Sequence, residues 1–336
     1  MVINTDPSSQ QHAIVVVCIV SPIVSSLFVA IRVWTRAFVS SSIGWDDYTA
    51  LVTWLFCIAY SVLIGLGTNY GFGWHTADIR PDRYVVYNEW IFISSIVYLI
   101  TLLGYKFSIL LLYLRIFGVD KNFRYSTWVV MFFVFGYLFS NTLTQVFGCT
   151  PIDKNWKPKT PGHCILMTKA DFAYGSMNLI SDLFIFVLPL PMVWRLQLSW
   201  KGKLGVTLIL MGGAIAFVVA LVRYSLLLHR FYVTDITWYD GKNLLWMVLE
   251  VNTGLVCSCT PALRPYFTHI ASNGFFKAAF GGLISHPKDS VRHKRRSDSG
   301  QLVRRNTGGD GFVVLGNNET EMEVPHNKAL KMVQDV

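Results

Sequence analysis

Long blocks of apolar residues alternate with short polar connections along most of this chain. A transmembrane helix needs about 20 consecutive, mostly apolar residues to cross the hydrocarbon core of a bilayer. Seven blocks meet that length, at residues 13–34, 46–67, 89–113, 126–147, 171–194, 205–228 and 243–264. The pattern predicts an all-α fold, a bundle of seven transmembrane helices whose two termini lie on opposite sides of the membrane.

The composition agrees with a membrane protein. Hydrophobic residues make up 53% of the chain and charged residues 15%, whereas about 25% of the residues in an ordinary globular domain are charged. A soluble core is built from shorter segments that each keep a polar face. No Lys or Arg precedes the first block, so this block is predicted to be a membrane anchor and not a cleaved signal peptide.

The direction of insertion is predicted from the C-terminal tail and two cysteines. Basic residues of the short loops divide equally between the two sides, eight and eight, so the preference for cytosolic Lys and Arg does not decide the direction there. Basic residues follow the last block closely, which places the C-terminus in the cytosol and the N-terminus outside or in a lumen. Cys149 and Cys164 then lie on the oxidising side, where a disulfide between them can persist.

The net charge of +9 is concentrated beyond the last block. Seven basic and two acidic residues between His286 and Arg305 account for five of these charges, which argues against a nucleic-acid-binding domain. We predict a short extension at 1–12, a seven-helix membrane domain at 13–267 and a cytosolic tail at 268–336. The tail is expected to be mostly disordered and to associate with an anionic lipid leaflet.

Polar residues inside the apolar blocks mark a candidate site. Asp171, Asn178 and Asp182 follow one helical face, and Arg223 and Glu250 are expected to meet at similar depth as a structural pair. Charged groups at such depths usually face the bundle interior. The cluster either fastens the helices to one another or lines a small-molecule pocket. The predicted ligand-binding residues are Gln145, Asp171, Tyr174, Asn178, Asp182, Arg223, Glu250 and Asn252.

Other polar motifs have simpler interpretations. Asp46 and Asp47 start the second block, where carboxylates cap free N–H groups and interact with the helix dipole. Lys106 is interpreted as extending to the headgroups, and His75 as a loop contact. No metal site or cofactor is predicted.

Several short motifs, taken in order, resemble one known family. They are Gly44-Trp45-Asp46-Asp47-Tyr48, Gly71-Phe72-Gly73-Trp74-His75, Tyr113-Leu114-Arg115, Cys149-Thr150-Pro151-Ile152 and Leu188-Pro189-Leu190-Pro191. Over residues 30–267 the chain resembles the fungal rhodopsin-like-domain family of integral membrane proteins, which includes pathogenicity-related receptors and proteins of toxin gene clusters such as that for satratoxin. The resemblance implies a seven-helix fold and a filamentous fungal source. It does not imply bound retinal, because retinal proteins hold the chromophore through a lysine of the last helix and the last block here has none. The motifs do not indicate whether the protein couples to a G protein.

Two functions are compatible with this sequence. The first is binding of a small apolar molecule or pathway intermediate in the outer half of the bundle, as a receptor-like or accessory component of secondary-metabolite biosynthesis. The alternative is a membrane-embedded cyclase or isomerase in which Asp182, Asp171 or Glu89 acts as a general acid. Asp182 is the preferred candidate because it is deepest and has no basic partner nearby in the sequence. The plasma membrane and the endoplasmic reticulum are both compatible locations.

Overall fold

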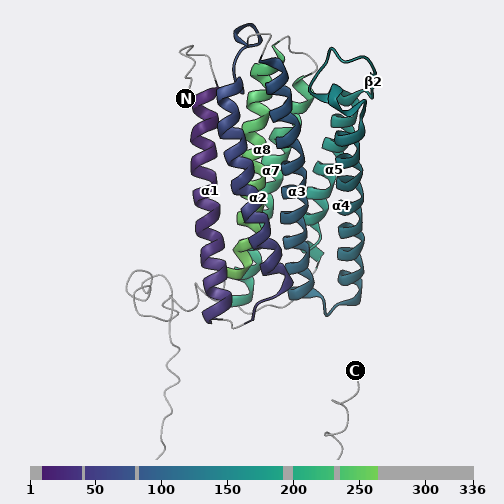
Figure 1. Cartoon of the computed structure of the whole chain (residues 1–336). Helices are drawn as coiled ribbons and strands as arrows, with labels where there is room; N and C mark the ends of the chain where they lie inside the picture. Colours follow the sequence, from purple (N-terminus) through teal and green to yellow (C-terminus); the bar gives the residue numbers. More distant parts are fainter. Residues whose placement is uncertain (1–9, 40–41, 80–82, 192–199, 231–234, 264–336) are drawn as a thin grey trace, which may run out of the picture. The chain divides into compact units, whose positions relative to one another are not determined.

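Seven long helices run side by side, with neighbours along the chain pointing in opposite directions (Figure 1). The computed structural model describes residues 10–39, 42–79, 83–191, 200–230 and 235–263. The long helices of this part are α1 (Gln11–Trp34), α2 (Trp45–Gly67), α3 (Tyr84–Phe117), α4 (Lys121–Phe147), α5 (Met167–Val187), α7 (Trp200–His229) and α8 (Ile236–Cys259). The predicted all-α, seven-helix fold is confirmed. The predicted disordered tail lies outside the described residues.

Five described segments are long and apolar enough to cross a membrane by themselves: Gln11–Val39, Trp45–Tyr70, Tyr84–Phe117, Lys121–Phe147 and Leu210–His229. The outward faces of these segments carry large apolar side chains such as Ile23, Leu55 and Phe132, which are 64%, 59% and 78% exposed. Contiguous apolar surface of this kind is typical of contact with lipid. The chain is therefore an integral membrane protein.

The other two helices, α5 and α8, are more polar, and several of their polar side chains face the bundle interior. Asn178 of α5 and Glu250 of α8 are each only 3% exposed. Helix α8 packs against α1, α2, α3 and α7, and no described side chain of this helix is exposed. A helix enclosed by other helices does not need a fully apolar surface.

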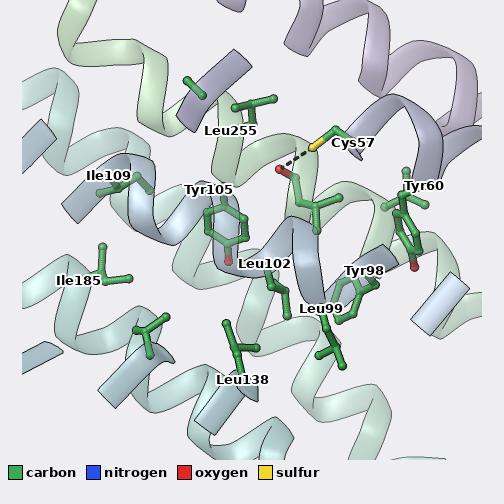
Figure 2. Close-up of a cluster of buried hydrophobic side chains, with 14 of the residues drawn as sticks. Cys57, Tyr60, Tyr98, Leu99, Leu102, Tyr105, Ile109, Leu138, Ile185 and Leu255 are labelled. Carbon is green, nitrogen blue, oxygen red and sulfur yellow. Dashed lines mark hydrogen bonds between the residues drawn. The ribbon is translucent and has the colours of Figure 1, made fainter. Parts of the chain in front are cut away.

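Helix α3 supplies the centre of the apolar core. Tyr98, Leu102, Tyr105 and Ile109 recur at a spacing of three or four residues and so share one face of the helix. These residues pack with Cys57, Tyr60, Leu138, Ile185 and Leu255 from the surrounding helices (Figure 2).

Close approach to α3 depends on a glycine. A Cβ atom at Gly104 would lie 2.3 Å from Thr53 Oγ1 of α2. Small residues at helix contacts allow membrane helices to approach closely, so Gly104 sets the separation of α2 and α3.

A small hairpin closes one end of the bundle, between α4 and α5. Its strands β1 (Cys149–Thr150) and β2 (His163–Cys164) pair antiparallel with Cys149 opposite Cys164, and the two cysteines form a disulfide across 15 residues. The predicted disulfide is confirmed. We call this end the disulfide end, and the opposite end the arginine end, after the cluster described below.

Removal of the disulfide is expected to destabilise the protein. A cross-link closing a loop of 15 residues contributes about 3 kcal/mol through chain entropy. Cys149→Ser and Cys164→Ser should therefore each lower the thermal midpoint of the purified protein, and reductant should have the same effect on the wild type. Cys18→Ala is the matched control, since Cys18 is a free cysteine and its loss leaves the response to reductant intact. Two free thiols in non-reducing peptide maps of the wild type would contradict the pairing.

Candidate functional site

A cavity of about 220 Å³ opens within the half of the bundle nearest the disulfide end, between α3, α4, α5, α7 and α8. Apolar side chains of α3 and α8, such as Leu99, Leu244 and Met247, form part of its wall. The polar or charged side chains that line it are Ser95, Tyr98, Tyr137, Asn141, Gln145, Asp171, Tyr174, Asn178, Arg223, Arg230, Asp240 and Asn243.

The rim of the cavity is a charged cluster around Arg230. Its Nε lies 2.9 Å from Asp240 Oδ1, and its Nη1 lies 3.8 Å from Asp171 Oδ2. Gln145 Nε2 donates to Asp171 Oδ1 at 3.2 Å. Two carboxylates thus share one guanidinium at the mouth of the cavity.

The floor of the cavity is the ion pair between Arg223 of α7 and Glu250 of α8. Arg223 Nε lies 2.8 Å from Glu250 Oε2, which confirms the predicted pair. Glu250 also accepts hydrogen bonds from Tyr98 Oη at 2.6 Å and Asn178 Nδ2 at 2.8 Å. The carboxylate is therefore fully engaged by protein donors.

A second ion pair joins Lys106 of α3 to Asp182, which lies one turn beyond Asn178 on α5. Lys106 Nζ is 2.8 Å from Asp182 Oδ1 and donates to Asn178 Oδ1 and Ser181 Oγ at 2.8 and 2.6 Å. The interpretation of Lys106 as extending to the headgroups is wrong, because this side chain is 0% exposed. The statement that Asp182 has no basic partner nearby holds only along the sequence. In space, Lys106 of α3 neutralises it.

Three polar atoms near the cavity have no hydrogen-bond partner among the residues that the structure describes. They are Asn141 Oδ1, Asn243 Oδ1 and Arg223 Nε, and all three are buried. Arg223 Nε is within ion-pair distance of Glu250, but its N–H direction does not meet hydrogen-bond geometry. A buried polar atom without a partner costs about 1–3 kcal/mol. Arg223 still has its ion pair with Glu250, whereas the two asparagine oxygens are not satisfied by the described part of the protein.

The structure separates the predicted ligand-binding residues into two groups. Gln145, Asp171, Tyr174, Asn178 and Arg223 line the cavity. Glu250 lies behind Arg223, and the remaining two are placed elsewhere, Asp182 in a smaller pocket of about 30 Å³ and Asn252 on the other side of α8.

Asn252 is a correction to the predicted site. Its Oδ1 accepts from Ser25 Oγ of α1 at 2.8 Å, and its Nδ2 donates to the carbonyl of Val248 at 2.9 Å. These bonds fasten α8 to α1, away from the cavity. Glu89, predicted at the mouth of the third helix, is also not among the residues that line the cavity.

Sequence reasoning did not assign Arg230, Asp240 and Asn243 to the site. Asp240 and Asn243 are spaced three residues apart with Leu244 and Met247 following, which is the periodicity of a helix face. We expected the seventh helix to begin only at 243, whereas α8 begins at Ile236. The first two turns of α8 therefore carry Asp240, a cavity residue that we had assigned to a loop.

The arginine end contains a buried cluster around Asp46 and Asp47. Arg32 of α1 is 1% exposed, and its Nη2 and Nε lie 2.7 and 2.9 Å from Asp46 Oδ2 and Asp47 Oδ1. Arg115 Nη1 lies 2.8 Å from Asp46 Oδ1. The predicted capping role is confirmed for Asp47, which accepts from the backbone N–H of Gly44 at 3.0 Å. The bridging of three helices was not predicted.

The connection between α2 and α3 is clamped to the start of α8 at the disulfide end. His75 stacks on Trp238 with ring centroids 5.7 Å apart, and Asp235 accepts from the backbone N–H and hydroxyl of Thr76 at 3.0 and 2.7 Å. Burial raises the pKa of Asp235, but hydrogen bonds from Thr76 and His75 outweigh this effect and lower the pKa to about 2. The carboxylate, and with it the clamp, therefore persists at any pH above about 4 and is lost only as the pH falls toward 2.

Comparison with known proteins places this bundle among fungal membrane proteins. A model of the fungal rhodopsin domain matches residues 31–269. A SAT4 family membrane protein of Emericella nidulans is 29% identical over 67% of this chain and 55% of its own length, so the chain spans little more than half of that relative. No solved structure matches the chain.

Two further relatives differ in the roles that their names describe. The fugralins biosynthesis cluster protein 2 of Gibberella zeae is 25% identical over 92% of this chain and 79% of its own length. The receptor GIN3 of Arthrobotrys oligospora is 26% identical over 74% of this chain and 61% of its own length. Similar proteins therefore include both a biosynthesis cluster protein and a receptor.

Proposed function

This chain belongs to the fungal rhodopsin domain family, and we propose that it binds a small amphipathic molecule in the cavity between α3, α4, α5, α7 and α8. The role we propose is that of a receptor-like or accessory component of secondary-metabolite biosynthesis. Relatives named as biosynthesis cluster proteins and as a receptor support a role of this kind.

The observation that carries the proposal is the contrast between the ion-paired floor of the cavity and two unpartnered asparagine oxygens in its wall. The buried groups beneath the cavity, Lys106, Asp182 and Glu250, are paired within the protein. Asn141 Oδ1 and Asn243 Oδ1 have no partner within the described ranges and line the cavity. A ligand that donates hydrogen bonds to them removes the cost of their burial.

The charges around the cavity favour a neutral polar group on the ligand. Asp171, Asp240 and Glu250 face the two guanidinium groups of Arg223 and Arg230, which leaves no excess of positive charge for an anion. A hydroxyl or amide group can donate to an asparagine oxygen and accept from Arg223. The volume of about 220 Å³ is below the usual 300–1,000 Å³ of ligand pockets, so it suits the polar end of a molecule and part of its apolar body.

The cavity does not favour the acid-catalysed alternative, which stays a prediction. Asp182, the preferred acid, does not line the cavity, and its carboxyl group is engaged by Lys106 at 2.8 Å. Asp171 lines the rim but is engaged by Gln145 and Arg230.

We also propose that the disulfide end faces the cell exterior or a lumen, with the C-terminus in the cytosol. Disulfides persist in oxidising compartments, and the hairpin with Cys149 and Cys164 is at the same end of the bundle as the cavity. The ligand would then be sampled on the non-cytosolic side of the membrane.

The test uses the purified protein in lipid nanodiscs and three ten-carbon probes: decanamide, 1-decanol and decanoic acid. Decanamide and 1-decanol are expected to raise the thermal midpoint more than decanoic acid, because a ligand that binds only the folded state stabilises it. Asn141→Leu should abolish the response to decanamide and raise the stability of the free protein by about 1 kcal/mol, since it removes an unpaired buried oxygen.

Asn252→Leu is the matched control. Asn252 is fully bonded to Ser25 and Val248 and lies outside the cavity, so its replacement should lower stability and preserve the response to decanamide. If no probe stabilises the wild type, or if Asn141→Leu responds like the wild type, the cavity is not the binding site.

A further inference from the structure

An apolar groove of about 660 Å³ lies between α4 and α5, outside the cavity. These two helices run side by side at one edge of the bundle in Figure 1. The lining of the groove includes Phe132 and Gly136 from α4, Ala173 and Met177 from α5, and Ile165 before α5. Phe132 is 78% exposed, so the groove opens toward the lipid.

Two tyrosines form a common wall between this groove and the cavity. Tyr137 and Tyr174 line both spaces. Tyr137 is fixed from inside the bundle, since its hydroxyl lies 3.1 Å from Asn178 Oδ1 and 3.2 Å from Ser181 Oγ. Tyr174 has different partners.

Within the described part of the chain, the Tyr174 hydroxyl has hydrogen-bond partners only on α4. It lies 2.9 Å from both Ser140 Oγ and Thr144 Oγ1, which themselves line the groove. Two hydrogen bonds between neutral hydroxyl groups therefore hold this ring between the membrane and the cavity. Of the two wall residues, Tyr174 is thus the one that can move without breaking a hydrogen bond inside the bundle.

We propose that the α4–α5 groove is the entrance through which the ligand reaches the cavity from the membrane, with Tyr174 as its gate. This inference rests on the proposed function. An apolar body partitions into the bilayer before it meets the protein. At the disulfide end the apolar body would have to pass the charged rim of Arg230, Asp171 and Asp240, which offers it no compensating contact. The groove carries no charged side chain among its lining residues and is mostly apolar.

The test blocks the groove without touching the cavity. A Cβ atom added at Gly136 meets no heavy atom within 4 Å, so Gly136→Phe can place its ring in the groove. With tritiated decanamide and nanodisc-embedded protein, we expect association and dissociation to slow by about ten-fold or more, with Kd unchanged within about two-fold. Tyr174→Phe removes both gate contacts and should speed both rates.

Two further variants make the result decisive. Met177→Trp blocks the same groove from α5 and should slow both rates as Gly136→Phe does, which covers the case in which one variant fails to fold. Ile23→Phe adds similar bulk on the lipid face of α1, where Ile23 is 64% exposed, and should leave both rates unchanged. Wild-type rates with wild-type Kd in the folded blocking variants would overturn the entrance alone. Absence of decanamide binding by the wild type would overturn the proposed function and the entrance together.

Discussion

Lys106→Met is expected to lower the free energy of unfolding by about 3–5 kcal/mol, because it leaves Asp182 as an uncompensated charge inside the bundle. Lys106 is 0% exposed and lies 2.8 Å from Asp182 Oδ1. It also donates to Asn178 and Ser181, so the substitution removes a shared partner of three polar groups. The measurement is the thermal midpoint of the detergent-solubilised protein, together with the amount that remains monodisperse.

A second substitution separates loss of the pair from loss of packing. Lys106→Met with Asp182→Leu replaces both charges by apolar side chains of similar size, and exchanges of this kind in buried ion pairs are often neutral or stabilising. The double variant should therefore recover most of the lost stability. Equal losses in the double variant and in Lys106→Met would show that the charges are not coupled.

Arg32→Leu is the second substitution with a large expected effect, again about 3–5 kcal/mol. Arg32 contacts both Asp46 and Asp47 and also donates to the carbonyl of Ser258 in α8. Without Arg32, the two adjacent carboxylates are paired only with Arg115 and with the more distant Arg36 among the described residues. We expect reduced accumulation of membrane-inserted protein and a lower thermal midpoint, measured on the same preparation.

Arg36→Leu is the matched control for the arginine end. Its closest approaches to Asp46 and Asp47 are 3.8 and 3.7 Å, which is beyond hydrogen-bond distance, so its replacement should lower stability much less than Arg32→Leu. A loss in Arg36→Leu as large as in Arg32→Leu would contradict the central role that we assign to Arg32.

The sequence alone predicted the helices well because the length of an apolar block is a local property. It predicted the disulfide from the sidedness of one connection. The ion pair between Lys106 and Asp182 was not predicted. The depth of a residue in the membrane follows from its position along its own helix, but which helix it faces depends on the packing of the whole bundle. Only the folded bundle, in which the Lys106 side chain reaches α5, reveals that each charge has a partner.

Two errors in the candidate site were avoidable with helical periodicity. Successive residues of an α-helix are rotated by about 100°, so residues two positions apart point to nearly opposite faces. Asn252 lies two positions after Glu250, and Glu89 two positions before Ile91, which lines the cavity. Similar depth in the membrane suggested that these residues belong to the site, but their angular positions direct them away from the cavity.

The two buried ion-pair clusters differ in when they can form during biosynthesis. Arg32 and its carboxylate partners are separated by only 14 and 15 residues along the chain, across the turn between α1 and α2. This hairpin can therefore enter the bilayer with its charges already neutralised by one another. Lys106 and Asp182 are separated by 76 residues, and α4 must be synthesised between them. The nascent α3 therefore carries an unpaired ammonium group until α5 has been synthesised.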